Sequence, residues 1–223
     1  MRKLISLIST FLMGSISICA FAGSVQSDFV DLIMQLQFNS AIDKASQIDQ
    51  KNGNRYHFYL AVFIEHSGQS PKEDQSYFAD FLDQVGTDTT AIEWLISGVY
   101  HLYNSPANAR TFEQLSYAID LADAEKDMRY IRKLATFAVL ELFAKEIVQT
   151  TDFHFKYLDT FQQDIDNVVD SAWYRLQYLR FTTKSLNIPE AAMEWPEAHA
   201  SFAEYFDGHA LNEQLRTFFY YES

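Results

Sequence analysis

Histidines and carboxylates are the side chains of this chain that could carry acid–base or metal chemistry. The sequence contains six histidines and 30 acidic residues. No two histidines lie four residues apart, and neither His-Glu-x-x-His nor Glu-x-x-His occurs, so the helical spacings that place two metal ligands on one face are missing. The densest group of such residues lies near the C-terminus and comprises Glu194, Glu197, His199, Glu204, Asp207 and His209.

This C-terminal group has two interpretations. Carboxylates and imidazoles that converge there would form a metal site or a hydrolase site, with Glu197, His199, Glu204 and His209 as the candidate residues. The alternative is the solvated surface of an acidic protein, which requires no ligand spacing. We expect the second, and therefore predict no metal site and no cofactor.

Nucleophilic and nucleotide chemistry have little support in the sequence. A Gly-x-Ser-x-Gly motif does not occur, and no two of the seven glycines lie closer than nine residues, so a glycine-rich phosphate loop is missing as well. We therefore predict no catalytic residue and a non-enzymatic function. A Ser-His-Asp triad is defined in space rather than in sequence, so a hydrolase stays open as an alternative.

Aromatic side chains are abundant and offer a different chemistry, the binding of another protein. They make up 16% of the residues. Exposed aromatic side chains in a groove would bind a partner, whereas buried ones would pack the core between helices. The sequence alone leaves both open. The candidate binding residues are Trp94, Tyr100, Tyr103, Phe153, Tyr157 and Tyr205.

The elements that must position these residues are helices. From residue 28 onward apolar residues recur every three or four positions, whereas glycine and proline are scarce, at 7 and 4 residues. No convincing strand pattern appears. We predict an all-α fold of stacked antiparallel helical hairpins that begin near residues 28, 56, 91, 127 and 168, with a terminal helix after residue 208.

Local signals mark several helix ends. Asn52-Gly53-Asn54 predicts a helix end, because Gly and Asn tolerate the left-handed conformation. Ser70-Pro71-Lys72-Glu73 and Thr90-Ala91-Ile92-Glu93 predict helix starts with capping boxes. The helix over residues 127–149 is apolar on nearly all sides between 134 and 144, which predicts a central position.

Part of the chain resembles the tetratricopeptide repeats, in which stripes of small residues let paired helices approach closely. The resemblance covers about residues 28–149 and lies in Phe38, Ala41, Ala45 and Ile48, in Trp94, Ser97 and Gly98, and in the segment 117–122 followed by Asp127. It implies a right-handed superhelix with a concave groove that binds peptides, and no catalysis. The proline that usually ends such a repeat is absent, and residues 150–223 fit less well. The alternative is an irregular helical bundle.

The N-terminus has the layout of a secretory signal peptide. Arg2 and Lys3 precede an uncharged, mostly apolar segment that ends in Ala20-Phe21-Ala22. We predict cleavage after Ala22, a secreted or periplasmic location, and one domain over residues 23–223. Cleavage would remove two basic residues, no acidic one and the only cysteine, Cys19, so the formal net charge would change from −13 to −15. Such a charge disfavours binding to nucleic acid.

These observations lead to three hypotheses of function. The first is an exported, non-enzymatic binding or scaffold module of the bacterial envelope, which holds a protein or peptide partner in a helical-repeat groove. The second is a sensory, ligand-binding domain of a signalling protein. The third is a hydrolase that uses the acidic and histidine residues near 194–209. No later segment is apolar enough to span a membrane, and the sequence does not define the oligomeric state.

Overall fold

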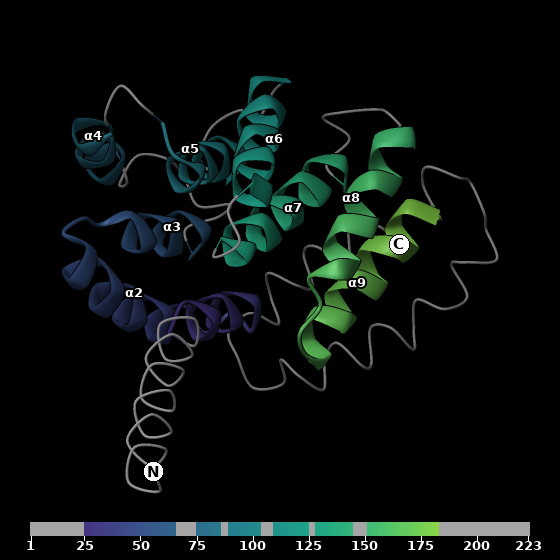
Figure 1. Ribbon diagram of the computed structural model, residues 1–223, viewed down its shortest axis with the longest axis horizontal. Helices are drawn as coiled ribbons and strands as arrows, with labels where there is room; N and C mark the ends of the chain where they lie inside the picture. Colours follow the sequence, from purple (N-terminus) through teal and green to yellow (C-terminus); the bar gives the residue numbers. More distant parts are fainter. Residues whose placement is uncertain are drawn as a thin grey trace, which may run out of the picture.

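The fold is described by a computed structural model, in which residues 25–65, 75–85, 89–103, 109–124, 128–144 and 151–182 are defined (Figure 1). All regular secondary structure in these residues is helical, which confirms the predicted all-α class. A first helix over residues 25–34 is followed by eight others. These are α2 (Phe38–Asn52), α3 (Tyr56–Glu65), α4 (Gln75–Gln84), α5 (Ala91–Tyr103), α6 (Ala109–Ala124), α7 (Arg129–Ala144), α8 (Thr151–Gln163) and α9 (Val168–Arg180).

The helices form successive pairs. From α2 to α9, all consecutive helices except α4 and α5 make extensive contacts, and α3, α5, α7 and α9 also contact one another in turn. Alternate contacts of this kind are what stacked two-helix units produce, so the packing is compatible with an α-solenoid. The starts of α3, α5, α7 and α9 at residues 56, 91, 129 and 168 agree with the predicted hairpin starts to within two residues.

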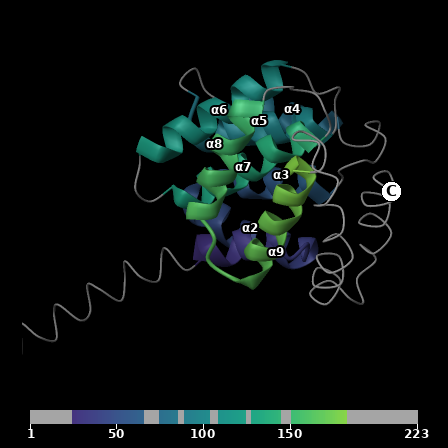
Figure 2. The same ribbon diagram turned by 90° about the vertical axis from the view of Figure 1, so that its right-hand side faces the viewer.

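Helix α7 lies at the centre of the molecule, as its apolar composition predicts (Figure 2). It contacts α5, α6, α8 and α9. Its buried apolar residues cover most of the helix circumference rather than one narrow stripe, and each contributes roughly 1.5–3 kcal/mol if it is a large aliphatic or aromatic side chain. They include Ile131, Leu134, Ala135, Ala138, Val139, Leu140, Leu142 and Phe143.

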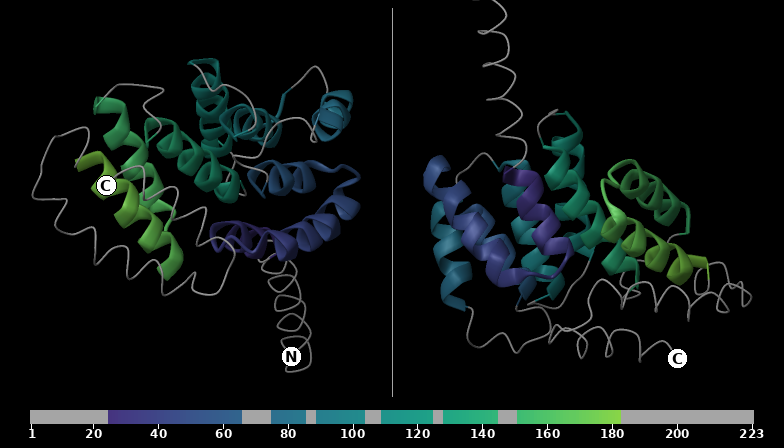
Figure 3. Two further views of the ribbon diagram at one scale, coloured as in Figure 1. Left: turned by 180° about the vertical axis from the view of Figure 1, so that it is seen from behind. Right: turned by 90° about the horizontal axis from the view of Figure 1, so that it is seen from below.

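The two ends of the described array meet. The Trp173 indole N–H on α9 donates a 2.9 Å hydrogen bond to the carbonyl oxygen of Met34, and Asn167 Nδ2 donates one of 2.9 Å to Asp31 Oδ1. The first helix therefore lies beside the start of α9 (Figure 3). Four apolar side chains of this helix are at most 3% exposed: Phe29, Val30, Ile33 and Met34. The contact is therefore part of the main core.

Local capping fixes several of the helix ends. Gly53 has a φ of 71° and its N–H bonds the carbonyl oxygen of Asp49, so it ends α2 as predicted. Glu93 accepts hydrogen bonds from the Thr90 backbone N–H (2.6 Å) and from the Thr90 hydroxyl (2.8 Å). The Glu93 half of the predicted capping box therefore forms at the start of α5.

The first helix ends earlier than its apolar stripe indicates. Periodicity places Leu36 on the same face as Phe29, Leu32 and Ile33. In the structure the helix stops at residue 34, and Leu36 adopts a left-handed φ of 63°. The Gln37 N–H bonds the carbonyl oxygen of Leu32, so the turn satisfies a carbonyl at the helix end at the cost of an unfavourable leucine conformation.

Close approach of α5 and α6 depends on one glycine. A Cβ atom at Gly98 would lie 2.5 Å from Leu115 Cδ2 and 2.6 Å from Leu115 Cγ. The small residue therefore makes room for Leu115, as the small-residue stripe predicts. The capping box at residues 70–73, the terminal helix expected after residue 208 and the segment 1–22 lie outside the described residues. No described helix is long and apolar enough to cross a membrane.

Candidate functional site

Three of the six predicted binding aromatics have described side chains: Trp94, Tyr100 and Tyr157. Tyr103 and Phe153 belong to α5 and α8, but their side chains lie outside the described residues, as does all of Tyr205. The candidate metal and hydrolase residues Glu197, His199, Glu204 and His209 also lie outside them.

Tyr157 is a core residue. Its side chain on α8 is 3% exposed, and its hydroxyl lies 3.0 Å from the Ser116 hydroxyl on α6. The ring meets Phe112 edge-on at a centroid distance of 5.9 Å. Tyr157 therefore holds α8 against α6 and does not face a partner.

Tyr100 attaches α4 to the rest of the molecule. Its half-buried ring stacks on Phe78 of α4 at 3.9 Å with an interplanar angle of 6°. Phe78 also meets His101 edge-on at 6.2 Å. Helix α4 lies at the edge of the molecule (Figure 1). This stack is therefore one of the main contacts that hold it there.

Trp94 lies next to an exposed aromatic residue that the sequence reasoning did not select. The half-buried Trp94 ring on α5 is 5.5 Å from the ring of Tyr117 on α6, and Tyr117 is 53% exposed. Leu121, one helical turn further along α6, is 40% exposed. We define the α6 surface by Trp94, Glu113, Tyr117, Asp120 and Leu121, of which all but the half-buried Trp94 are exposed.

The signal for this surface was available in the sequence. Leu115, Ala118, Ile119 and Ala122 form the apolar part of the buried side of α6. Positions that fall between the members of a buried stripe point away from it, because a helix turns about 100° per residue. An aromatic and a leucine at such positions are exposed apolar residues. The α6 surface can thus offer aromatic faces, a leucine side chain and two carboxylates to a partner.

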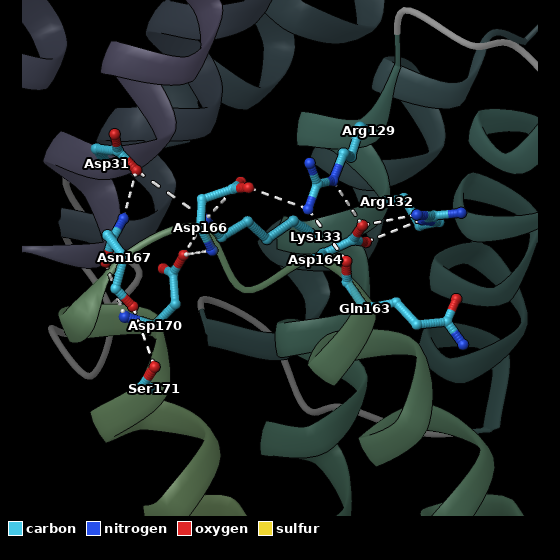
Figure 4. Close-up of polar contacts among 10 residues, drawn as sticks. All are labelled: Asp31, Arg129, Arg132, Lys133, Gln163, Asp164, Asp166, Asn167, Asp170 and Ser171. Carbon is cyan, nitrogen blue, oxygen red and sulfur yellow. Dashed lines mark hydrogen bonds and ion pairs between the residues drawn. The ribbon is translucent and has the colours of Figure 1, made fainter.

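A second polar feature joins the first helix, α7 and the turn between α8 and α9 (Figure 4). We call it the polar junction. Most of its charges are paired across helices that are far apart in the sequence, and sequence periodicity gave no indication of it. It comprises Asp31, Arg129, Arg132, Lys133, Asp164, Asp166, Asn167 and Asp170.

Lys133 is the buried cation of the junction. Its side chain is 3% exposed, and its ammonium group pairs with the buried carboxylate of Asp170. The carboxylates of Asp166 and Asp31 lie 3.6 and 4.0 Å from Lys133 Nζ. Burial raises the pKa of Asp31, and so do the nearby carboxylates Asp170 and Asp166, whereas Lys133 lowers it.

Asp164 is a second buried anion of the junction, beside Asp170. It accepts hydrogen bonds of 2.9 Å from Arg129 Nε and Arg132 Nε. Arg132 also pairs with Asp123 at the end of α6. The hydrogen bond to Asp164 raises the pKa of Arg132. The arginines thus connect α7 to the end of α8 and to α6.

Asn167 orders the start of α9. Its side-chain oxygen accepts a 3.0 Å hydrogen bond from the Asp170 N–H, which is an N-cap, and its amide group bonds Asp31 on the first helix. Each cation of the junction is held by a carboxylate, so the arrangement is suited to joining helices. Among the described residues, no three His, Cys, Asp or Glu side chains are placed to hold a metal ion.

Two buried histidines complete the polar interior. His57 Nδ1 lies 2.8 Å from Asp49 Oδ1, and Asp49 also accepts the backbone N–H groups of His57 and Phe58 at the start of α3. His154 is 5% exposed, lies between the rings of Phe143 and Phe181, and burial lowers its pKa to about 4. Both histidines are structural in this arrangement.

The fold and the α6 surface define an all-α protein of stacked helix pairs with an exposed aromatic and acidic surface. No protein-family model matches the chain, and no match was found among curated proteins or solved structures.

Proposed function

We propose that this chain is an exported, non-enzymatic binding or scaffold module that holds a segment of a partner protein. The single observation that carries the proposal is the α6 surface, where Tyr117 is 53% and Leu121 40% exposed beside Trp94. Exposed apolar surface is costly in water, and aromatic side chains are enriched where proteins bind each other.

Stacked helix pairs support the same function. Arrays of two-helix units expose long, regular helix faces, and proteins built from them commonly bind other proteins. The contacts among α3, α5, α7 and α9 follow that plan. The resemblance to tetratricopeptide repeats points the same way and stays part of the proposal, as does the export that residues 1–22 predict.

The position of the bound segment differs from the expected concave groove. The first helix packs against α9 through Met34 and Trp173. The two ends of the described array are therefore in contact with each other. We place the partner on the outer side of α6 instead, where the exposed aromatic residue lies.

The test is site-specific photo-cross-linking in envelope preparations of an expressing bacterium. A photoreactive phenylalanine at position 117 should give one discrete cross-linked product. The matched control places the same residue at Leu82, which is 52% exposed on α4. Equal products at both positions, or none at position 117, would contradict the proposal.

A further inference from the structure

One face of α6 is exposed along its length. Glu113, Tyr117, Asp120, Leu121 and Ala124 recur at intervals that place them on the same side of the helix, and all five are exposed. At a rise of 1.5 Å per residue this face is about 17 Å long, which is three helical turns. A segment of similar length could therefore lie along it.

The acidic side chains of this face outnumber its basic ones, because Arg110, exposed one turn before Glu113, is the only basic residue of α6. Within the described part of the chain, no ion pair engages Glu113 or Asp120, in contrast to Asp123 on the same helix, which pairs with Arg132. The whole chain has a formal net charge of −13. The potential over the α6 surface is therefore negative and attracts cations.

The aromatic pair adds a second attraction for cations. The rings of Trp94 and Tyr117 lie 5.5 Å apart at 41°, and Tyr117 is more than half exposed. Lysine and arginine side chains bind the faces of tryptophan and tyrosine, with more energy where water is excluded. Tyr117 and Leu121 supply the apolar contact that such a partner also needs.

We propose that the α6 surface binds a basic, amphipathic segment of a partner protein, in which lysine or arginine side chains alternate with apolar ones along about three helical turns. This inference rests on the proposed function and names the chemistry of its partner. A second copy of the chain is disfavoured, because it would bring two acidic surfaces together.

The test measures binding of a synthetic amphipathic helix of lysine and leucine, about five turns long, to the full chain by fluorescence anisotropy. Two control peptides are used: one of the same composition with the pattern scrambled, and one with glutamate in place of lysine. The amphipathic basic peptide should bind more tightly than both, and raising the salt from about 0.05 to about 0.3 M should weaken it.

The decisive variant is the triple change Glu113→Gln, Tyr117→Ser and Asp120→Asn. It should weaken binding of the basic peptide by about tenfold or more, because it removes a cation–π contact and two ion-pair partners. The matched control, Leu82→Ser with Asp83→Asn on α4, also removes exposed apolar and acidic groups and should change affinity less than about twofold. Equal losses in both variants, or tighter binding of the glutamate peptide, would overturn the inference.

The two proposals fail in different ways. If the segment cross-linked at position 117 proves to be neutral or acidic, the binding function stands and the basic partner is wrong. If no cross-link forms at position 117, but binding of the basic peptide is weakened by the triple change as expected, the surface does bind basic segments. The proposal that it binds a partner protein in the envelope is then wrong.

Discussion

At the scale of single residues, the polar junction contains charged side chains that are buried and paired with opposite charges. Lys133 and Asp170 are both buried and form an ion pair, and Asp164 is held by two arginines. None of these pairs follows from sequence periodicity, because the partners lie 32 to 37 positions apart in the sequence. A basic run at residues 129–133 and an acidic run at 164–170 were visible in the sequence, but only the packing of α7 against α8 and α9 pairs them.

Replacement of Lys133 by methionine should be strongly destabilising. It would leave the Asp170 carboxylate buried without its cation, and breaking one side of a buried pair costs about 3–5 kcal/mol. Urea unfolding followed by circular dichroism measures the loss. The double variant Lys133→Met with Asp170→Leu should recover much of the stability, because neither charge remains buried. A single variant as stable as the parent would show that the pair is not needed.

The buried His154 should make the protein sensitive to mild acid. Its pKa is lowered to about 4 in the folded state, below the ordinary value of 6.5, because burial disfavours the charged ring. Above pH 6.5 His154 is neutral in both the folded and the unfolded chain, so the free energy of unfolding keeps its full value. As the pH falls from 6.5 toward 4, the unfolded chain takes up a proton at His154, and the free energy of unfolding decreases by up to about 1.4 kcal/mol per pH unit.

The comparison with His154→Leu isolates this effect. Leucine can occupy the apolar site between Phe143 and Phe181 and cannot take up a proton. Unfolding free energies at pH 7 and pH 5 should differ by about 2 kcal/mol less in the variant than in the parent. Parallel pH profiles for the two proteins would show that His154 does not titrate in a buried site.

At the scale of helices, local signals in the sequence were reliable. The helix end at Gly53 and the Glu93 cap of α5 could be predicted, because each depends on residues within a few positions of each other. The turn at Leu36 could not, since a left-handed conformation is unusual for leucine. Tyr157 is buried and Tyr100 is half-buried, although both are tyrosines. The contacts between helices decide this difference, and the sequence pattern does not show them.

Gly98 offers a direct test of how closely α5 and α6 must approach. The change Gly98→Val should destabilise the protein by about 2 kcal/mol or more, because its side chain would overlap Leu115. Alanine in the same position should cost less, since its helix propensity is better by about 1 kcal/mol. Thermal unfolding measures both.

A second change identifies the cause. In a double-mutant cycle, Leu115→Ala should make Gly98→Val much less harmful than it is in the parent. Additive effects would mean that crowding against Leu115 is not what excludes a side chain at residue 98.

At the scale of the whole molecule, the junction between the first helix and α9 determines how cooperatively the array behaves. Trp173 is 4% exposed and bonds the carbonyl oxygen of Met34. The all-α class, the pairing of helices and the central place of α7 could be predicted, because they depend on periodicity and composition. The meeting of the two ends could not, because it depends on how the angles between helices accumulate along the array.

The change Trp173→Phe should destabilise the first helix and α9 at the same time. Loss of the buried hydrogen bond leaves the Met34 carbonyl without this donor, at a cost of about 1–3 kcal/mol. Amide hydrogen exchange measured by mass spectrometry should then quicken in residues 25–34 and in α9 alike, with a smaller change in α5. Faster exchange in only one of the two ends would show that they open independently.

The junction of the two ends also has a consequence for the order in which the chain can fold. Asp31 and Met34 bond Asn167 and Trp173, which lie 136 and 139 positions later in the sequence. Contacts within each helix pair form over short loops, whereas contacts across so long a loop are slow to form. During synthesis, which begins at the N-terminus, the first helix is therefore made before the other described helices but contacts its final partners last. Until α9 follows, the Met34 carbonyl and the Asp31 side chain lack these partners.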